Sequence, residues 1–130
     1  MSVVRVAAGI ILKNQKVLIA QRPMSKHKGG YWEFPGGKIE NQETPESALI
    51  RELKEELNIQ VQQMSEYMQL NFQYPEKTVA LSFFLVESFI GIPRGMENQP
   101  VQWVSIDKLV QLRFPEANLP VIKKLLVDHA

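Results

Sequence analysis

Residues 37–59 of the chain read GKIENQETPESALIRELKEELNI, and they contain the clearest helix signal in the sequence. Thr44 followed by Pro45 predicts a helix start, because a threonine hydroxyl caps a backbone N–H and proline suits the first helical position. Asn58 accepts a left-handed conformation, so we expect the helix to end near Leu57. Apolar residues at helical spacing mark the side that we expect to be buried: Ala48, Leu49, Ile50, Leu53 and Leu57.

Three carboxylates, Glu52, Glu55 and Glu56, fall on one face of this helix, because successive residues are about 100° apart. Arg51 can pair with Glu55, but each pair of like charges at this spacing costs about 0.2–0.5 kcal/mol, so the face stays under-compensated. Carboxylate oxygens are hard ligands that suit Mg²⁺ or Mn²⁺, and a helix fixes their separation. The alternative is a solvated acidic helix face, and the cluster taken alone favours this alternative.

The surroundings of the cluster resemble the signature of the Nudix hydrolases. That signature is Gly, five residues, Glu, seven residues, then Arg-Glu-apolar-any-Glu-Glu-any-Gly-apolar. Gly37, Glu43 and the run Arg51 to Ile59 match it, and the only departure is Asn58 in place of the last glycine. Three further stretches resemble the MutT branch of the family, which sanitises oxidised guanine nucleotides: EFPGGKIE at residues 33–40, LVES at residues 85–88 and FPEANLPVI at residues 114–122. The resemblance therefore covers nearly the whole chain.

Length and composition are compatible with this resemblance. The chain has 130 residues, 45% of them hydrophobic and 22% charged, which predicts one globular domain over residues 1–130 with a core of its own. A net charge of +1 gives no broad basic surface, so we expect a free nucleotide as partner and no nucleic acid polymer. The chain has no cysteine for a disulfide or a thiolate metal site. We see neither a signal peptide nor a membrane-spanning run, and so expect a cytoplasmic protein that is a monomer.

The pattern along the chain predicts a mixed sheet with helices on both faces. We expect strands at residues 3–12, 17–22, 32–34, 60–71 and 77–87, with a hairpin joining the first two and the last one central in the sheet. Pro35, Gly36 and Gly37 predict a turn, and residues 88–101 contain too many glycines and prolines for a regular element. Ser105 predicts the cap of a short helix at residues 106–112, and a last helix runs from residue 119 or 120 to about 127. The resemblance implies the same α/β (α+β) architecture, an α/β/α sandwich with a mixed β-sheet between helices.

The resemblance also implies a division of roles within the site. Glu52 positions or deprotonates the attacking water, and Glu97 is our second choice for that role. The metal is held by the Gly37 carbonyl with Glu52, Glu55, Glu56 and Glu97, although an ordinary loop glutamate is an equal alternative for Glu97. Two residues play a structural part, since Glu43 folds back so that Arg51 orients the acidic face.

Substrate specificity depends on residues outside this segment. Arg22 matches an arginine that contacts phosphate or base, or it is a surface charge at a strand end. Phe34 walls a base pocket, or it belongs to the core. Asn118 either caps the last helix or pairs with the guanine edge, where its amide suits both O6 and the N7–H that 8-oxoguanine has and guanine lacks.

The function that we expect is a Mg²⁺-dependent nucleoside triphosphate pyrophosphohydrolase, for which Mn²⁺ can replace Mg²⁺. It hydrolyses 8-oxo-dGTP, with 8-oxo-GTP or dGTP as further substrates, and so removes mutagenic nucleotides before DNA replication. Two alternatives stay open. One is a Nudix hydrolase of ADP-ribose or of a dinucleoside polyphosphate, and the other is a non-catalytic nucleotide-binding module.

Overall fold

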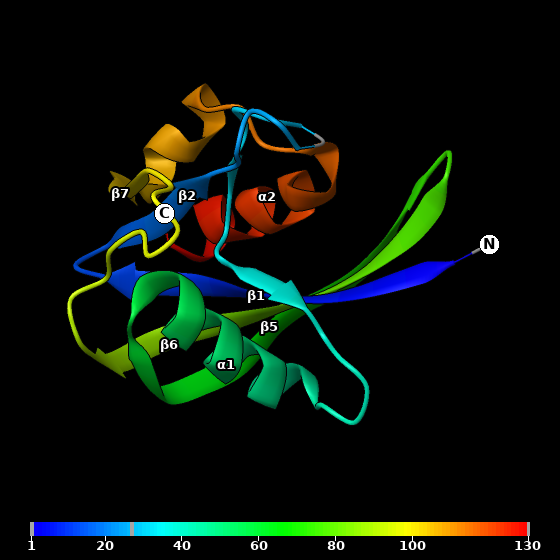
Figure 1. The fold of residues 1–130 in the computed structure, drawn as a ribbon. Coiled ribbons are helices and arrows are strands. Elements are labelled where there is room, and N and C mark those ends of the chain that lie inside the picture. The colour runs from blue at the N-terminus through cyan, green and yellow to red at the C-terminus, as the bar shows by residue number, and fades with distance from the viewer. Residues whose placement is uncertain (1, 27, 130) are drawn as a thin grey trace.

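A computed structural model describes every residue of the chain except 1, 27 and 130. Its strands are β1 (Val3–Lys13), β2 (Lys16–Gln21), β3 (Trp32–Glu33), β4 (Gly36–Lys38), β5 (Gln60–Tyr74), β6 (Lys77–Ile90) and β7 (Val101–Ser105). Its helices are α1 (Pro45–Leu57), the 3₁₀ helices η1 (Ile106–Gln111) and η2 (Glu116–Asn118), and α2 (Leu119–Asp128). The strands of the described residues form one mixed sheet in the order β3-β2-β1-β6-β5, with β4 paired to β1 and β7 paired to β2 (Figure 1).

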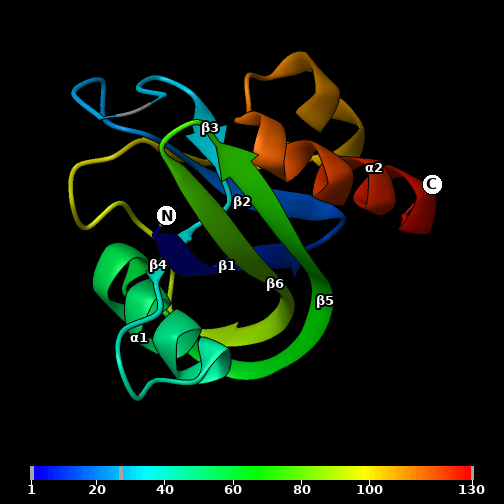
Figure 2. The same ribbon diagram turned by 90° about the vertical axis from the view of Figure 1, so that its right-hand side faces the viewer.

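Helices cover both faces of this sheet, as Figure 2 shows, so the predicted layered architecture with a mixed sheet is confirmed. The faces follow from alternation along β1, because successive strand side chains point to opposite sides. Ala7 and Ile11 pack with buried residues of α1, whereas Ala8, Ile10 and Leu12 pack with buried residues of η1 and α2. One sheet therefore serves two hydrophobic cores.

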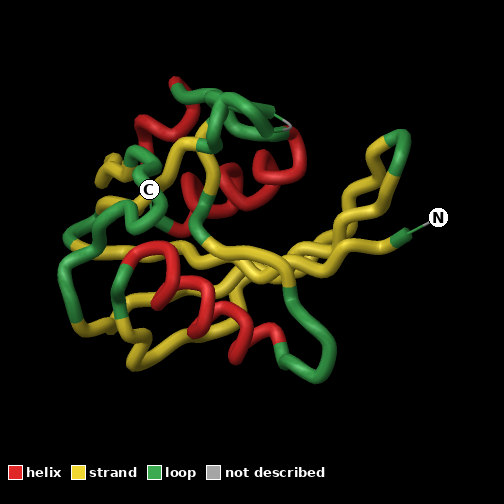
Figure 3. The backbone as a smooth tube through the Cα atoms, in the orientation of Figure 1, coloured by secondary structure: helices red, strands yellow, loops and turns green. Residues whose placement is uncertain are grey.

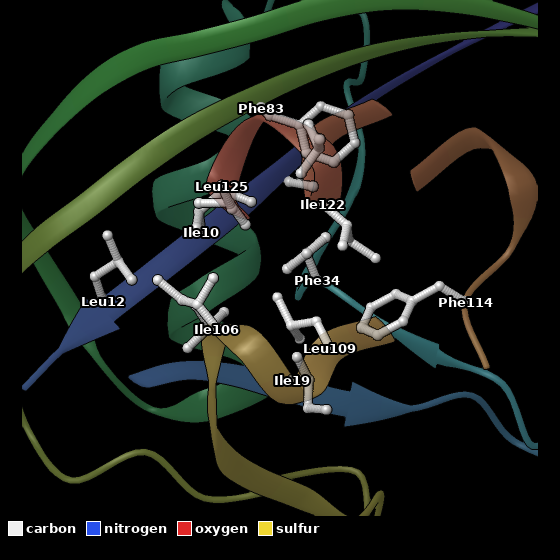
Figure 4. Packing of buried hydrophobic residues seen from close by; sticks show 13 residues of the cluster. Ile10, Leu12, Ile19, Phe34, Phe83, Ile106, Leu109, Phe114, Ile122 and Leu125 are labelled. Atoms are coloured by element: carbon white, nitrogen blue, oxygen red, sulfur yellow. The ribbon is translucent and has the colours of Figure 1, made fainter. Parts of the chain in front are cut away.

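The core on the α2 side contains Phe34, which also lines the cavity of the candidate site. Phe34 is 4% exposed (Figure 4). Its ring packs edge-on against the ring of Phe83, with centroids 6.1 Å apart. The ring of Phe114 is tilted against it, with a centroid distance of 5.2 Å. These contacts fix the chain immediately after β3. They therefore also fix the start of β4, two residues further on.

The predicted helix and hairpin are both present. Thr44 caps α1, since its hydroxyl accepts a 3.0 Å hydrogen bond from the Ser47 N–H, and Asn58 ends the helix with φ 58°. The hairpin between β1 and β2 turns through Asn14 and Gln15, both with positive φ. This is the conformation that two-residue hairpin turns require.

Part of the predicted buried face of α1 is wrong. Ala48, Leu49, Leu53 and Leu57 are buried, but Ile50 is 43% exposed. It lies on the flank of the helix where β5 ends the sheet, and lines a shallow groove there with Val61 and Met64 of that strand. Helical spacing identifies apolar positions, but it does not tell where the sheet stops.

Two other predictions need correction. Residues 36 and 37 are not only a turn, because Gly36 and Gly37 belong to β4 and pair with Ala8 and Ala7 of β1. A Cβ on Gly36 would lie 2.0 Å from the Ala7 carbonyl oxygen, so the glycine permits this close approach of two backbones. Strand β7 follows the irregular loop and was not predicted.

Three elements differ in type or length from the prediction. The short helix after Ser105 is a 3₁₀ helix, and Ser105 stands at its N-cap without a side-chain cap hydrogen bond. Strands β5 and β6 are longer than predicted and form a hairpin that curves away from α1 (Figure 3). The central position of β6, between β1 and β5, is confirmed.

Candidate functional site

A cavity of about 570 Å³ lies beside the acidic face of α1 and reaches from β4 to the start of α2. Seven of the eight residues predicted to bind metal or substrate line it: Arg22, Phe34, Gly37, Glu52, Glu56, Glu97 and Asn118. The eighth, Glu55, does not line it. A groove of similar size on the other flank of α1, the one beside Ile50, contains none of the eight.

Arg51 organises the acidic face from behind the cavity. Its Nε and Nη2 donate to the two carboxylate oxygens of Glu43 at 2.7 and 2.9 Å, so the predicted contact between these two residues is present. Its Nη1 donates to Glu52 at 2.8 Å and to Glu55 at 3.2 Å, and its Nη2 also donates to the Lys38 carbonyl at 3.1 Å. One guanidinium thus ties α1 to β4 and to the loop between them.

The hydrogen bonds between Arg51 and Glu43 also shift the pKa of each group toward its charged form. Hydrogen bonds from Arg51 lower the pKa of the Glu43 carboxyl from 4.5 to about 2, and the pKa of Arg51 is raised in return. Both groups are therefore charged across the physiological range. Arg51 also contacts Glu55, whose side chain is 53% exposed and does not line the cavity.

Glu56 lines the cavity, and the pKa of its carboxyl is raised, whereas that of Glu43 is lowered. Burial raises the pKa of the Glu56 carboxyl well above the usual range, and a hydrogen bond with Glu52 raises it further. The negative charges of Glu52, Glu33 and Glu97 act in the same direction. The charged form of Glu56 is therefore costly when no cation is beside it.

This donor set fits a magnesium ion better than a metal that needs a complete protein cage. Within the described residues, no three histidine or acidic side chains are gathered closely enough to form a ready-made cluster. Mg²⁺ is usually held by one or two carboxylates together with waters and substrate phosphates. A pair of half-buried carboxylates at the wall of an open cavity matches that requirement.

Gly37 leaves room for the Glu52 side chain. A Cβ at this position would lie 1.9 Å from Glu52 Oε2 and 2.4 Å from its Cδ. Any side chain on residue 37 would therefore push the Glu52 carboxylate out of its place. The glycine also brings the backbone of β4 directly against that carboxylate.

The loop of residues 91–100, between β6 and β7, carries Glu97 to the C-terminal end of α1. The Met96 N–H donates to the Glu56 carbonyl at 2.9 Å, and the Arg94 N–H donates to the Leu57 carbonyl at 3.1 Å. These carbonyls are left without partners where a helix ends. The loop thus places the Glu97 charge close enough to act on Glu56.

Arg22 and Phe34 both line the cavity. Arg22 Nη1 donates to Glu33 Oε1 at 2.7 Å, and burial raises the pKa of Glu33 while the arginine charge lowers it. Phe34 lines the cavity while its ring packs in the core against Phe83 and Phe114, and its contact with a base stays a prediction.

Asn118 lies at the other end of the cavity, at the junction of η2 and α2. It is the N-cap residue of α2, but its side chain makes no capping hydrogen bond, and its Nδ2 donates to the Pro115 carbonyl at 3.4 Å. The tip of the β5–β6 hairpin contacts the same turn, because Tyr74 accepts a hydrogen bond from the Ala117 backbone N–H. The amide group thus lies at the cavity, as its second interpretation requires.

Among the lining residues that sequence reasoning did not identify are Glu33, Tyr74 and Lys77. Glu33 stands directly before Phe34 in the EFPGG stretch, which could have indicated it. Tyr74 and Lys77 come from the hairpin tip, and only the tertiary structure brings them here. Lys26 and Lys38 also line the cavity. Cationic side chains across from carboxylates suit an anionic ligand that carries a divalent cation.

The comparisons with known proteins agree with this geometry. A family model described as the NUDIX domain matches residues 6–124. The chain is 44% identical over 126 residues to the 8-oxo-dGTP diphosphatase of Escherichia coli strain K12, which covers 96% of this chain and 98% of that protein. It is 33% identical to the CTP pyrophosphohydrolase of the same strain, over 100% of this chain and 96% of the relative. A solved structure from work on MutT of Aliivibrio salmonicida and Vibrio cholerae superimposes with a TM-score of 0.86 at 40% identity, covering 98% of this chain and 99% of the other.

Within the described residues, no helix is long and apolar enough to cross a membrane.

Proposed function

Because the chain belongs to the NUDIX domain family of hydrolases, we propose that it hydrolyses 8-oxo-dGTP to 8-oxo-dGMP and pyrophosphate. The observation that supports this proposal best is the single cavity that joins the acidic face of α1 to Asn118. One end suits a diphosphate with its cation, and the other offers an amide to a base. The role in the cell is to remove an oxidised nucleotide before it enters DNA.

Nudix hydrolases generally use a divalent metal ion, and we propose Mg²⁺, with Mn²⁺ as a substitute. The residues that would hold it are Glu52, Glu56 and Glu97 with the Gly37 carbonyl. A bound cation neutralises phosphate charge that builds up during the reaction. Glu55 belongs to the proposed set as well; in the structure it is 53% exposed, contacts Arg51 at 3.2 Å and does not line the cavity.

Hydrolysis requires a water whose proton is removed as its oxygen attacks phosphorus. In the proposed reaction the water attacks the β-phosphorus, the bond to the oxygen bridging the α- and β-phosphates breaks, and that oxygen leaves with the monophosphate. Glu52 accepts the proton of the water. Arg51 holds one oxygen of Glu52 at 2.8 Å, which orients the carboxylate. General-base help of this kind contributes about 10²- to 10⁴-fold in rate. Glu97 remains the second choice for this role.

Recognition of the oxidised base is assigned to Asn118. Its side-chain carbonyl accepts from N7–H, and its amide nitrogen donates to O6. Guanine has no hydrogen on N7, so its N7 would face the amide oxygen without a hydrogen bond. A site that depends on such a bond discriminates strongly against the ligand that lacks it. Arg22, held by Glu33, supplies positive charge to the base or the phosphates.

We propose that the chain acts as a monomer on free nucleotides in the cytoplasm, without a nucleic acid polymer or a membrane as partner. The net charge of +1 supports this, because binding to a polyanion usually relies on a basic surface.

The test compares kcat/KM for 8-oxo-dGTP and dGTP in the wild type and in Asn118→Ala, with CTP and ADP-ribose as further substrates. Loss of the amide leaves hydrogen-bonding groups of the bound base without partners, which costs about 1–3 kcal/mol, so the preference for the oxidised base should fall about 10- to 100-fold. The activity toward dGTP should change much less. Release of orthophosphate without pyrophosphate would contradict the reaction, and a preference for CTP or ADP-ribose would contradict the substrate.

A further inference from the structure

The loop of residues 91–100 has to hold Glu97 in place without the support of regular secondary structure. It contains Gly91, Pro93, Gly95 and Pro100, which do not favour a regular element. Its first half is attached to α1 through backbone N–H groups, and its last residue is attached to the sheet, where the Pro100 carbonyl accepts from the Gln21 N–H at 3.0 Å. Glu97 lies between these attachments.

The side chain of Gln99 links this part of the loop to the end of α1. Its Nε2 donates to the Glu56 backbone carbonyl at 3.2 Å, and its Oε1 accepts from the Glu97 backbone N–H at 2.8 Å. Gln99 is half-buried and lines the cavity. One amide group therefore links the backbones of two carboxylate residues that lie 41 positions apart in the sequence and face the same cavity.

The local structure is adapted to this arrangement. A Cβ at Gly95 would lie 2.0 Å from the Gln99 carbonyl oxygen and 3.0 Å from Gln99 Oε1, so glycine leaves room for the glutamine. Asn98 takes a left-handed conformation with φ 64°, and its N–H donates to the Gly95 carbonyl at 3.2 Å. The turn of residues 95–98 thus closes next to the Gln99 side chain, and Glu97 in this turn lines the cavity.

A glutamine is the residue type that these two bonds require. The link needs a donor and an acceptor on one rigid group at the end of a side chain. A glutamate at this position would have no donor for the Glu56 carbonyl, and an asparagine would be one methylene too short to reach both partners.

We propose that Gln99 is a positioning residue for the metal site, which fixes Glu97 relative to Glu56 and so keeps both carboxylates within reach of one divalent cation. This inference rests on the proposed function, in which both glutamates bind the ion. Gln99 itself contacts neither substrate nor cation. Residues that orient metal ligands in this way typically contribute about 10- to 100-fold in metal affinity.

The experiment measures Mn²⁺ binding to the protein without nucleotide, by the electron paramagnetic resonance signal of the unbound ion. The proteins are the wild type, Gln99→Ala, Glu97→Gln and the double variant. We expect Gln99→Ala to weaken Mn²⁺ binding about 10- to 100-fold and to have little further effect when Glu97→Gln is already present. Amide hydrogen exchange should be faster at Met96 and Glu97 in Gln99→Ala, because the loop is released from α1.

Gln69→Ala is the matched control, since Gln69 is exposed on β5 and does not line the cavity. Wild-type Mn²⁺ affinity of Gln99→Ala would overturn the proposal. So would an equal weakening by Gln99→Ala in the presence and in the absence of Glu97→Gln, or an unchanged affinity of Glu97→Gln. None of these results depends on which nucleotide is hydrolysed, so a wrong substrate assignment would be recognised separately by the product analysis.

Discussion

Replacement of Gly37 by alanine should separate the activity of this protein from its stability. The added Cβ would lie 1.9 Å from Glu52 Oε2, which is about 1.5 Å short of ordinary van der Waals contact. Because β4 is paired with β1 on one side, the Glu52 side chain has to give way rather than the backbone. Its carboxylate must therefore move by more than 1 Å and weaken its 2.8 Å bond with Arg51.

The expected magnitudes follow from the kind of group that moves. A displacement of a catalytic group by about 1 Å can cost about 10²-fold in rate, so kcat should fall at least about 100-fold. Stability should change little, because rotating the end of one side chain that lines the cavity costs less than opening a core. Alanine also reduces the freedom of the unfolded chain, which offsets about 0.4–1 kcal/mol of any loss.

The assay combines pyrophosphate release, Mn²⁺ binding and urea unfolding, with Gly9→Ala as the matched control. Gly9 lies on β1, and a Cβ there would meet Leu53 at 3.4 Å and Leu49 at 3.6 Å, which are ordinary contacts. The control should keep both kcat and the unfolding midpoint. If Gly37→Ala keeps the wild-type kcat and Mn²⁺ affinity, the reasoning about space at Glu52 is refuted.

Three other changes test separate parts of the site. Glu52→Gln should lower kcat about 10²- to 10⁴-fold while nucleotide binding is retained, and a near-normal rate in a pyrophosphate assay would remove Glu52 from the role of base. Phe34→Ala should lower the free energy of unfolding by about 3–5 kcal/mol in a urea titration, since the ring packs on Phe83 and Phe114; a loss below about 1 kcal/mol would mean that Phe34 is not core. Glu43→Gln tests the pair with Arg51 through pH. Because the pKa of Glu43 falls from 4.5 in the unfolded chain to about 2 in the folded one, the pair stabilises the protein above pH 4.5, and this contribution is lost as the pH falls toward 2. The stability difference between wild type and Glu43→Gln should shrink over this window, and a constant difference would argue against the pairing.

The parts of the fold that the sequence predicts are those with local signals. The ends of α1 depend on Thr44, Pro45 and Asn58, which act within one turn of their own positions. Strand β7 lacks such a signal, because its five residues follow Pro100 at the end of a loop rich in breakers. It becomes a strand because β2 has an open edge beside it, and this is a property of the assembled sheet. The same holds for β4, whose two glycines are used for close backbone approach rather than only for turning.

The candidate site shows the same division between local and tertiary information. Helical geometry places Glu52, Glu55 and Glu56 on one face, but it does not tell which part of that face opens to the cavity. In the structure Glu52 and Glu56 line the cavity, whereas Glu55 is 53% exposed and paired with Arg51. Gln99 and Tyr74 could not be identified from spacing, since their partners, Glu56 and Ala117, are 43 positions away in sequence.

The uneven compensation of charge along α1 is itself an argument for ligand binding. Arg51 contacts Glu52 and Glu55 in this helix and Glu43 in the loop before it. Glu56 is in a different situation, because its carboxyl is removed from water and lies near the charges of Glu52, Glu33 and Glu97. Burial of a carboxyl group among like charges destabilises the folded state, and such an arrangement commonly marks a functional site. A divalent cation that binds between these carboxylates replaces their mutual repulsion by attraction to the ion. The same carboxyl that is costly to charge in the folded state is therefore the one that a bound cation would stabilise.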